Sequence, residues 1–413
     1  MKFLRLASLD QVYSEYVQIL KPISETLEVP TLESLGFVCA EDVFASQDLP
    51  GFDKSLVDGY AVRSKDTIGA SPNLPVMLRL ALEVKIGEEP IGSINENEAA
   101  WVATGAMLPS GADAVVMVEH TQRFNEYVEV MKPVASGENV LRKNEDVKRG
   151  QAAVTRGERI NPGHLQLLLQ LGVERLRVFR RLRVGVISTG DEIVEPFVKE
   201  KSLVQVRDSN SYGLVAWLKS LGFEANRVGL CRDDEGELFR TLKSWFNEYD
   251  VLVVSGGSSI GARDFTEAAI DRLGKPGVLF HGILIQPGKP TILAIVDDKP
   301  IVGLPGNPVS FTISTKFVLL PIMRRLEGEK DFLFKSSGMV KLTRNVSSRQ
   351  GREQFIRVKL FEKQGQVWAE PLESETAQVS NLTRADGVIR VPSDVEGLSS
   401  GELAEFYPLW FGW

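Results

Sequence analysis

The sequence predicts a multidomain α/β plus β protein, whose largest unit is a doubly wound, mostly parallel α/β domain over residues 180–328. The main observation is the alternation of apolar strand-like runs with amphipathic helix-like segments in that range. Short β-type runs separated by Gly, Pro and Asn between residues 60 and 140 predict a small β-rich domain. Alternation of apolar and polar residues predicts a C-terminal all-β domain over residues 334–413. At 413 residues, the chain has room for about two to four domains.

The N-terminal region predicts two helices. Ser8 and Gln11 have the spacing of a capping box, and apolar residues follow on one helical face, which predicts a first helix over about residues 9–20. The segment TLESLGFVCAEDVFA (31–45) predicts a second, short helix that runs into an extended segment.

A further helix is expected at residues 162–172, where Pro162 suits a first turn and Gly172 suits a stop. Similar helix-containing pieces therefore flank the β-rich region. We expect residues 1–45 and 145–179 to form one discontinuous linking domain, into which the β-rich domain, residues 46–144, is inserted.

From residue 180 the expected strands are near-continuous runs of Val, Leu and Ile, as in a parallel sheet covered on both faces. The expected strands are LRVGVIS (182–188), EANRVGL (224–230), VLVV (251–254), GVLFHGI (277–283), TILAIV (291–296) and PIVGL (300–304). The expected helices are SNSYGLVAWLKSLG (209–222), EGELFRTLKSWFNE (235–248), TEAAIDRLG (266–274) and PVSFTISTKFVLLPIMRRL (308–326). Ligands of such sheets bind beyond the carboxyl ends of the strands.

Composition excludes several classes of function. The formal net charge is -7, which gives the protein no global attraction to nucleic acid or to an anionic membrane. The two cysteines, Cys39 and Cys231, form no CxxC pair, which argues against a disulfide framework and favours a reducing cytoplasm. The three histidines lack zinc-binding spacing, which argues against structural zinc and against a Ser/His/Asp hydrolase. We find neither a signal peptide nor a membrane span, so we expect a cytoplasmic protein.

Polar residues follow the ends of several expected strands. They occur in TGDEIVEP (189–196), CRDD (231–234), SGGSSIGARD (255–264) and PGNPVS (305–310). In the last segment, Asn307 suits an N-cap and Pro308 a first helical residue, so the N–H groups of Val309 and Ser310 predict an anion site. The SGG turn lets the backbone approach a ligand, and its serines can donate to oxyanions. These loops predict a phosphate-type ligand; the GxGxxG and GxxxxGK[ST] patterns are absent, which argues against NAD and P-loop ATP sites.

Acidic residues follow three of the same strands. Glu192, Asp233, Asp234 and Asp264 could converge as oxygen ligands of Mg²⁺, which takes one or two carboxylates together with substrate phosphates. Any single acid could equally cap a helix, because Asp233 precedes EGELF and Asp264 precedes TEAAIDRLG. Four acids at one edge, beside two anion-type loops, favour a metal–phosphate site. Lys289 in QPGKP (286–290) could clamp an oxyanion, although surface turns often carry a lysine.

Several motifs, taken together, carry a family resemblance. They are SLVDGYAVR (55–63), VATGAMLPSGADAVVMVE (102–119), GENVLRKNEDVKRG (137–150), STGDEI (188–193), RDSNS (207–211), RDD (232–234), SGGSSIGARDF (255–265), QPGKP (286–290), GLPGNPVSF (303–311) and GREQFIRV (351–358). They cover essentially the whole chain in this order. The chain resembles the molybdopterin molybdenumtransferases, the MoeA and gephyrin E-domain family.

The resemblance implies an elongated four-domain homodimer that inserts molybdenum from molybdate into adenylylated molybdopterin and releases AMP with Mg²⁺ present. It implies a cleft between the α/β domain of one subunit and the β-rich domain of the other, and a dimerisation role for the linking domain. The catalytic residues it implies are Asp58, Thr104, Asp146, Glu192 and Asp264, with Glu192, Asp233, Asp234 and Asp264 as metal ligands.

The cofactor-binding residues that it implies come from the α/β domain and from the C-terminal domain. They are Thr189, Gly190, Asp208, Ser209, Asn210, Ser255, Gly256, Gly257, Ser258, Lys289, Pro305, Gly306, Asn307, Pro308, Ser310, Arg352 and Thr376. The chain departs from the family pattern at three places: Val57 replaces Met, Gln286 replaces the first Lys of KPGKP, and ETAQVSNLTRADG (375–387) stands for a Ser-rich segment, which leaves Thr376 and Ser380 uncertain.

The proposed chemistry fits the residue types. Cleavage of a phosphoanhydride needs a metal and a carboxylate that positions water, not a histidine. Molybdate, a dianion, would be held by Arg, Lys, hydroxyl and backbone N–H donors, for which the loops at 255–265 and 303–311 are candidates.

Three alternatives stay open from sequence. The chain could be the adenylyltransferase of the same pathway, which shares the SGG-type domain; the extra regions 1–179 and 330–413 disfavour this. It could insert tungsten. It could be a non-enzymatic scaffold of the same fold, which the lack of an appended linker disfavours. An adenylyltransferase and molybdoenzymes are the expected protein partners.

Overall fold

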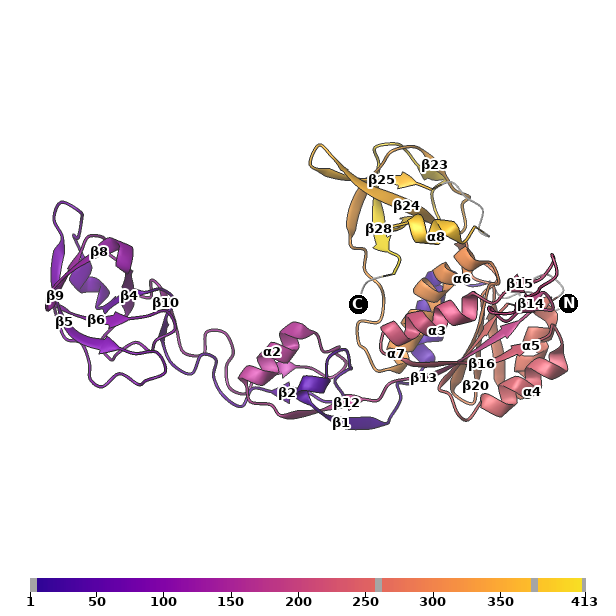
Figure 1. The fold of residues 1–413 in the computed structure, drawn as a ribbon, viewed down its shortest axis with the longest axis horizontal. Helices are drawn as coiled ribbons and strands as arrows, with labels where there is room; N and C mark the ends of the chain where they lie inside the picture. The colour runs from indigo at the N-terminus through magenta and orange to yellow at the C-terminus, as the bar shows by residue number, and fades with distance from the viewer. Residues whose placement is uncertain (1–5, 257–261, 373–377, 411–413) are drawn as a thin grey trace.

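The computed structural model describes residues 6–256, 262–372 and 378–410, without the side chains of residues 262–264. The molecule is elongated, with a β-rich unit at one end, an α/β unit at the other and a linking unit between them (Figure 1). The C-terminal β unit lies beside the α/β unit (Figure 1). Within the described ranges, no helix combines the length and the apolar content needed to cross a membrane.

The α/β unit is built on one six-stranded sheet. Its strands are β13 (Arg183–Thr189), β16 (Glu224–Cys231), β17 (Val251–Ser255), β18 (Pro276–His281), β20 (Ile292–Val296) and β21 (Lys299–Leu304). They lie in the order β16-β13-β17-β21-β20-β18, and β20 alone runs antiparallel to both of its neighbours.

Helices cover both faces of this sheet. They are α3 (Asn210–Ser220), α4 (Glu235–Trp245), α5 (Ala262–Leu273), α6 (Pro308–Ser314), the π-helical η5 (Thr315–Leu319) and α7 (Leu320–Leu326). Leu214 and Leu218 of α3 pack with Val184 and Val186 on one face, whereas α4 and α5 pack around Ile187 on the other. The predicted doubly wound, mostly parallel α/β fold is confirmed.

The first predicted helix is present, but it belongs to the α/β unit. It comprises α1 (Leu9–Gln11) and the π-helical η1 (Val12–Val17), and Ser8 and Gln11 form the expected capping box. The buried hydroxyl of Tyr16 donates to the carbonyl of Ala294 at 2.7 Å, and Val12 and Val17 lie in the same core as the sheet. We expected this helix within the linking domain, but its apolar face packs into the α/β core.

The linking unit joins two distant segments of the chain. Its elements are β1 (Thr26–Pro30), η2 (Thr31–Glu33), β2 (Val43–Phe44), β11 (Ala152–Val154), α2 (Pro162–Gln170) and β12 (Arg175–Phe179). β1 pairs with β12 and β2 pairs with β11, both antiparallel. The helix predicted at 162–172 is confirmed as α2, which Asn161 caps by accepting from the His164 N–H at 2.9 Å.

The second helix predicted within residues 31–45 is only the 3₁₀ turn η2. The Thr31 hydroxyl donates to the carbonyl of Val173 at 2.6 Å, which holds the turn against the other segment. Gly36 has φ +76°, which ends the helical path. Because Leu32 and Leu35 are exposed, no buried apolar face stabilises a longer helix.

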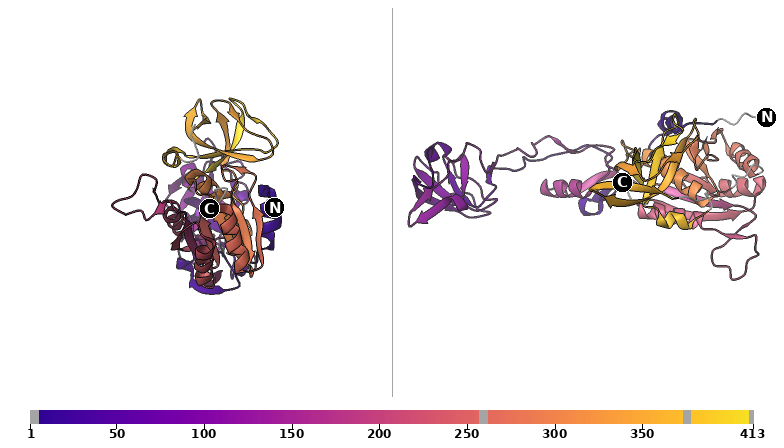
Figure 2. Two further views of the ribbon diagram at one scale, coloured as in Figure 1. Left: turned by 90° about the vertical axis from the view of Figure 1, so that its right-hand side faces the viewer. Right: turned by 90° about the horizontal axis from the view of Figure 1, so that it is seen from above.

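The β-rich unit contains a six-stranded sheet and a separate two-stranded sheet. Its elements are β3 (Lys54–Ser55), β4 (Gly59–Val62), η3 (Ser64–Thr67), β5 (Val76–Val84), β6 (Glu98–Val102), β7 (Ala114–Met117), η4 (Val118–His120), β8 (Thr121–Phe124), β9 (Tyr127–Val130) and β10 (Val140–Leu141). Six strands lie in the order β7-β4-β6-β5-β9-β8, and β3 pairs with β10. Two extended segments connect this unit to the rest of the chain (Figure 2), and there the Leu49 N–H donates to the carbonyl of Val147 at 2.7 Å.

The C-terminal unit is also built on one sheet. Its elements are β22 (Gly338–Leu342), β23 (Val346–Ser347), β24 (Glu353–Lys363), β25 (Gln366–Pro371), α8 (Ser380–Arg384), β26 (Gly387–Val391), β27 (Gly397–Leu398) and β28 (Leu403–Pro408). β19 (Ile285–Gln286), which follows β18 of the α/β unit, adds to this sheet by pairing parallel with β24. The QPGKP turn therefore leads directly from the C-terminal sheet back to the α/β unit.

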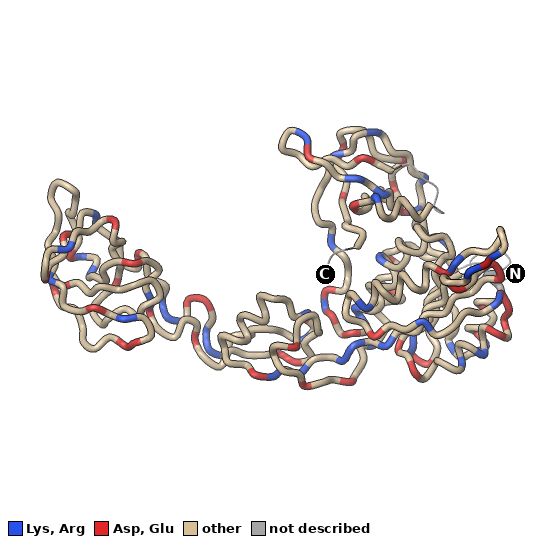
Figure 3. Tube along the Cα trace, in the orientation of Figure 1, with Lys and Arg blue, Asp and Glu red and all other residues tan. Residues whose placement is uncertain are grey.

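Charges of both signs are mixed along the chain trace (Figure 3), but one ionic cluster is buried where the linking and α/β units meet. Arg159 Nη2 lies 2.7 Å from Glu327 and 2.8 Å from Glu329. Arg324 pairs with Glu329, and Arg181 lies 3.5 Å from Glu327. Burial raises the pKa of Glu327, which the nearby guanidinium groups of Arg159 and Arg181 oppose. The cluster therefore holds the linking unit against the α/β unit through buried ion pairs, in which each charge is stabilised by an opposite one.

We expect Arg159→Ala to lower the free energy of unfolding by about 3–5 kcal/mol, because it leaves Glu327 buried without its closest cation. Urea unfolding measures this change. Arg175→Ala is the matched control: Arg175 pairs with Glu28 at 3.1 Å on the surface, where loss of a pair costs about 1 kcal/mol or less. Equal losses in the two variants would contradict the role given to the cluster.

Candidate active site

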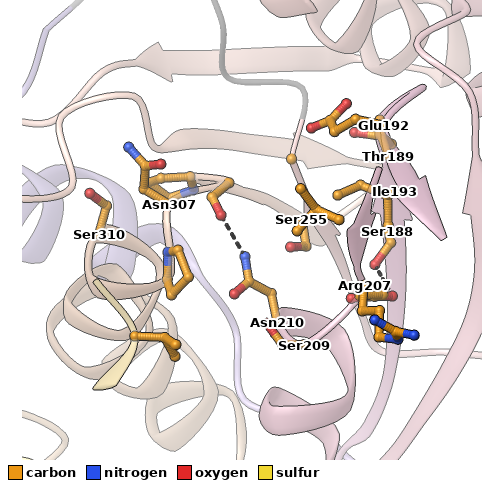
Figure 4. A pocket seen from close by; sticks show the side chains of 18 of the residues that line it. Ser188, Thr189, Glu192, Ile193, Arg207, Ser209, Asn210, Ser255, Asn307 and Ser310 are labelled. Atoms are coloured by element: carbon orange, nitrogen blue, oxygen red, sulfur yellow. Dashed lines mark hydrogen bonds between the residues drawn. The ribbon is translucent and has the colours of Figure 1, made fainter. Parts of the chain in front are cut away.

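A cavity of about 750 Å³ opens at the carboxyl ends of the parallel strands. Most of its lining residues belong to the loops that follow β13, β16, β17 and β21. The lining comprises Ser188, Thr189, Gly190, Glu192, Ile193, Val206, Arg207, Asp208, Ser209, Asn210, Asp233, Ser255, Gly256, Pro290, Pro305, Gly306, Asn307, Pro308, Ser310 and Val379. Figure 4 shows that these side chains gather from separate loops around one space. This is the edge at which ligands of an α/β sheet bind.

The loop after β17 approaches the loop after β13 so closely that it needs a glycine. Gly256 has φ +104°, and a Cβ at this position would lie 2.2 Å from the carbonyl oxygen of Thr189. A Cβ on Gly306 would lie 3.8 Å from the Cα of Gly256, so the β21 loop is also adjacent. The cavity is therefore bounded by bare backbone on two sides, which lets a bulky polyatomic ligand come close to the chain.

The β21 loop leads into a helical stretch that begins at the cavity. Asn307 occupies the N-cap position and Pro308 the first helical position of α6, as predicted, although the Asn307 side chain makes no capping hydrogen bond. η5 and α7 continue the helical path to Leu326. The first-turn N–H groups of a helix have no acceptor within the helix, and the helix dipole favours an anion beside them. This end of the cavity suits a phosphate.

Asp208 lines the cavity and also holds the third loop in place. The buried Asp208 carboxylate accepts from the Ser188 hydroxyl at 2.6 Å, the Ser211 hydroxyl at 2.5 Å and Arg227 Nε at 3.1 Å. The neighbouring Asn210 Nδ2 donates to the Gly306 carbonyl at 2.8 Å, which ties this loop to the β21 loop (Figure 4). The short strands β14 (Ile193–Val194) and β15 (Val206–Arg207) pair and complete the wall.

Of the two neighbouring aspartates after β16, Asp233 faces the cavity and Asp234 caps a helix. Asp233 lines the cavity with Glu192, and its buried Oδ1 has no hydrogen-bond partner among the described residues. Burial raises the pKa of Asp233, and the negative charges of Glu192 and Asp191 raise it further. Asp234 accepts from the Glu237 N–H at 2.7 Å and is the N-cap of α4. The capping alternative therefore holds for Asp234, and Asp233 is the better candidate for a ligand.

No group of three His, Cys, Asp or Glu side chains in the described part of the chain could enclose a metal ion by itself. Glu192 and Asp233 remain as a pair of carboxylates on one cavity. Asp264 lies in α5, but its side chain is outside the described set, as are Gly257, Ser258 and Thr376. A pair of carboxylates suits Mg²⁺ only when substrate phosphates complete its coordination.

Three predicted catalytic residues lie far from this cavity in the same chain. Asp58 and Thr104 are together in the β-rich unit, where Asp58 Oδ1 accepts from the Thr104 N–H at 2.6 Å and from its hydroxyl at 2.9 Å. These bonds, the backbone bond first, lower the pKa of Asp58. The exposed Asp146 lies in the segment that returns to the linking unit, with its N–H bonded to the Leu49 carbonyl. The β-rich unit is at the opposite end of the molecule from the cavity (Figure 1).

Two further predicted residues do not line the cavity. Lys289 is exposed beside the lining residue Pro290, and the half-buried Arg352 lies just before β24 in the C-terminal unit. The other described cofactor-binding predictions in the α/β unit all line the cavity. Val379, which brings the C-terminal unit to the cavity rim, was not predicted. No motif in the surrounding segment indicates that it lies at a binding site. Ser188 and Arg207 were also missed, although they stand at the edges of the quoted motifs STGDEI and RDSNS.

Comparison with known proteins agrees with this geometry. Residues 7–172 match the MoeA N-terminal region (domains I and II), residues 185–325 a probable molybdopterin-binding domain, and residues 339–409 the MoeA C-terminal region (domain IV). A putative molybdopterin biosynthesis protein of Methanocaldococcus jannaschii is 36% identical over 96% of this chain and 94% of its own length. A molybdopterin molybdenumtransferase of Synechococcus elongatus is 32% identical over 97% of this chain and 98% of its own length. The crystal structure of a molybdopterin biosynthesis MoeA protein from Pyrococcus horikoshii covers 99% of this chain and 100% of its own, at 37% identity and a TM-score of 0.72. The chain therefore belongs to the MoeA family of molybdopterin biosynthesis proteins.

Proposed function

We propose that this chain is a molybdopterin molybdenumtransferase, which inserts molybdenum from molybdate into adenylylated molybdopterin and releases AMP in molybdenum cofactor biosynthesis. The observation that carries the proposal is the cavity in which the bare backbone at Gly256 and the start of α6 face Glu192 and Asp233. The reaction is that of the curated relatives named molybdopterin molybdenumtransferase.

The two backbone loops are suited to the phosphate groups of an adenylylated pterin. Gly256 admits a phosphate close to the chain, and the start of α6 supplies N–H donors and a favourable dipole. Molybdate needs cationic and hydroxyl donors. Ser310, which lines the cavity, and Lys289, which is next to the lining residue Pro290, would supply them, and the family resemblance adds Arg352 and Thr376. Gln286 stands where relatives carry a lysine, so Lys289 is the only ammonium of this turn.

Glu192 and Asp233 are suited to hold Mg²⁺, with Asp264 as a third acid. The buried Oδ1 of Asp233 has no partner in the described part of the chain, and its carboxyl group is close enough to Glu192 for their charges to interact. Mg²⁺ at these carboxylates would neutralise charge that develops on the phosphate oxygens. Binding there would also relieve the repulsion that raises the pKa of Asp233.

In the hydrolytic step, water attacks phosphorus, the phosphoanhydride bond breaks and AMP leaves. The chain contributes mainly positioning and electrostatic stabilisation, as in other phosphoryl transfers. A cavity carboxylate that accepts a hydrogen bond from the water orients it. The Asp208 network and the bond from Asn210 to Gly306 keep two phosphate-facing loops at a fixed separation.

We further propose that a second copy of the chain completes the site. Asp58, Thr104 and Asp146 lie in or beside the β-rich unit, which cannot reach the cavity of its own chain in this elongated arrangement (Figure 1). In a homodimer, the β-rich unit of one subunit could face the α/β unit of the other. The lowered pKa of Asp58 keeps it anionic, as an acid that orients a substrate group must be.

The test is turnover by the purified chain with adenylylated molybdopterin, molybdate and Mg²⁺. We expect AMP to be released and molybdenum to appear in the pterin product. ATP-dependent adenylylation of molybdopterin by this chain alone would instead indicate an adenylyltransferase. Stronger binding of tungstate than of molybdate in a competition experiment would indicate a tungsten-inserting variant. Absence of all these reactions would contradict an enzymatic role and favour a scaffold.

We also propose that the protein works in the cytoplasm, with an adenylyltransferase as supplier of its substrate and molybdoenzymes as recipients of its product. Both cysteines are buried free thiols, which fits a reducing compartment.

A further inference from the structure

A second polar cavity, of about 360 Å³, lies where the α6–α7 helical stretch meets the segment that leads into the C-terminal unit. Its polar lining includes Lys316, Arg324, Lys335, Ser336, Ser337 and Tyr407. It shares no lining residue with the candidate active site. The proposed function therefore leaves this cavity unused.

Lys316 is the unusual residue of this cavity. It lies on the π-helical η5, is 3% exposed, and its Nζ is 4.5 Å from the ring centroid of Phe334. Within the described ranges it has no hydrogen bond or ion pair, so the aromatic ring is its only charge-stabilising contact there. Burial lowers the pKa of Lys316 to about 8, and the positive charge of Arg324 contributes. A buried ammonium without an anion is costly, which makes an anionic occupant favourable.

The neighbouring carboxylates do not neutralise Lys316. Among the described residues, the adjoining ionic cluster pairs three largely buried arginines, Arg159, Arg181 and Arg324, with two buried glutamates, Glu327 and Glu329. Those glutamates are engaged by the arginines, and Arg324 directs both Nε and Nη2 to Glu329. Neither glutamate pairs with Lys316 in the described part of the chain, so its buried ammonium is not neutralised by this cluster. The remaining acid on the cavity, Asp331, has a side chain that is 75% exposed and lies 3.9 Å from Lys335.

We propose that this cavity binds a small tetrahedral oxyanion of the phosphate or sulfate class, with Lys316 as its main charged donor. Ser336 and Ser337, in the segment entering β22, line the same cavity, and their hydroxyl groups would supply further donors. The bound anion would contact both the α/β unit and the start of the C-terminal unit. It would therefore favour one placement of the C-terminal unit, whose Val379 lies at the rim of the candidate active site.

Calorimetric titration of the full chain with inorganic phosphate at pH 7 tests the proposal. We expect Lys316→Met to weaken the site by about tenfold or more, since a charge-assisted hydrogen bond contributes at least that factor. Methionine fills the same space without a charge, so the variant should melt no lower than the parent chain when no anion is present. Lys85→Met is the matched control, because its side chain is 78% exposed in the β-rich unit and it lines neither cavity; we expect the affinity of this variant to change by less than about threefold.

Crystals of the parent chain soaked in selenate locate the anion independently of any variant. We expect an anomalous peak within hydrogen-bond distance of Lys316 Nζ. A peak confined to the candidate active site, or equal phosphate affinity in Lys316→Met and the parent chain, would overturn the proposal. Because the two cavities share no residues, either result would leave the proposed enzymatic function untouched.

Discussion

Asp233→Asn is expected to lower the rate of AMP release from adenylylated molybdopterin by about 10²–10³-fold, a typical loss for one preorganised group that stabilises a transition state. Its carboxylate lines the cavity and has a buried oxygen without a partner in the described part of the chain. Glu192→Gln should cause a loss of similar size, because Glu192 shares that cavity and the proposed Mg²⁺. An amide keeps the shape of each side chain but removes the charge.

Asp234→Asn is the matched control for Asp233→Asn. Asp234 caps α4, and asparagine is as good an N-cap as aspartate, so the helix and the rate should both be retained within a few-fold. The rates are measured as AMP released at saturating molybdate and Mg²⁺, with melting temperatures recorded for each variant. Equal losses at positions 233 and 234, or an unchanged rate in Asp233→Asn, would remove Asp233 from the site.

Mixing Asp58→Ala with Glu192→Gln is expected to restore activity that neither variant has alone. If each site takes Asp58 from one subunit and Glu192 from the other, a mixed dimer carries one intact site. Equal mixing with free subunit exchange should then recover about a quarter of the parent activity, since half of the dimers are mixed and half of their sites are intact.

The control for this experiment is a mixture of Glu192→Gln with Asp233→Asn. Both substitutions lie in the same α/β unit, so every site in a mixed dimer keeps one damaged residue, and no recovery is expected. The activity of each mixture is compared with that of its parent variants after subunit exchange. Recovery in neither mixture, or equal recovery in both, would contradict a site shared between subunits.

The α/β and C-terminal units could be predicted from sequence because their strands carry strong periodicity. Runs such as VLVV are apolar on both faces and end at polar or glycine-rich turns, here SGG, so their elements could be placed within a few residues. The prediction of a second helix within residues 31–45 was wrong, because the apolar residues Leu32 and Leu35 stay exposed and Gly36 adopts φ +76°. The first helix was assigned to the wrong unit because an amphipathic pattern shows that a helix has a buried face, but not which core buries it.

The candidate site was partly predictable for the same reason. The carboxyl ends of parallel strands meet at one edge, so Thr189, Ser255 and Asn307 could be grouped without a structure. Asp233 and Asp234 could not be separated, because both precede α4 and only the backbone decides which one caps it. Nor could the sequence indicate that the Asp208 carboxylate accepts hydrogen bonds from Ser188, Ser211 and Arg227. It also could not indicate that Val379 reaches the cavity rim, since that contact links distant segments.

A crystal structure of this chain with adenylylated molybdopterin is the most direct test of the candidate active site. We expect the phosphates to lie against the backbone at Gly256 and at the start of α6, with Glu192 and Asp233 beside the phosphoanhydride. Density for the ligand outside this cavity, including density confined to the Lys316 cavity, would contradict the assignment.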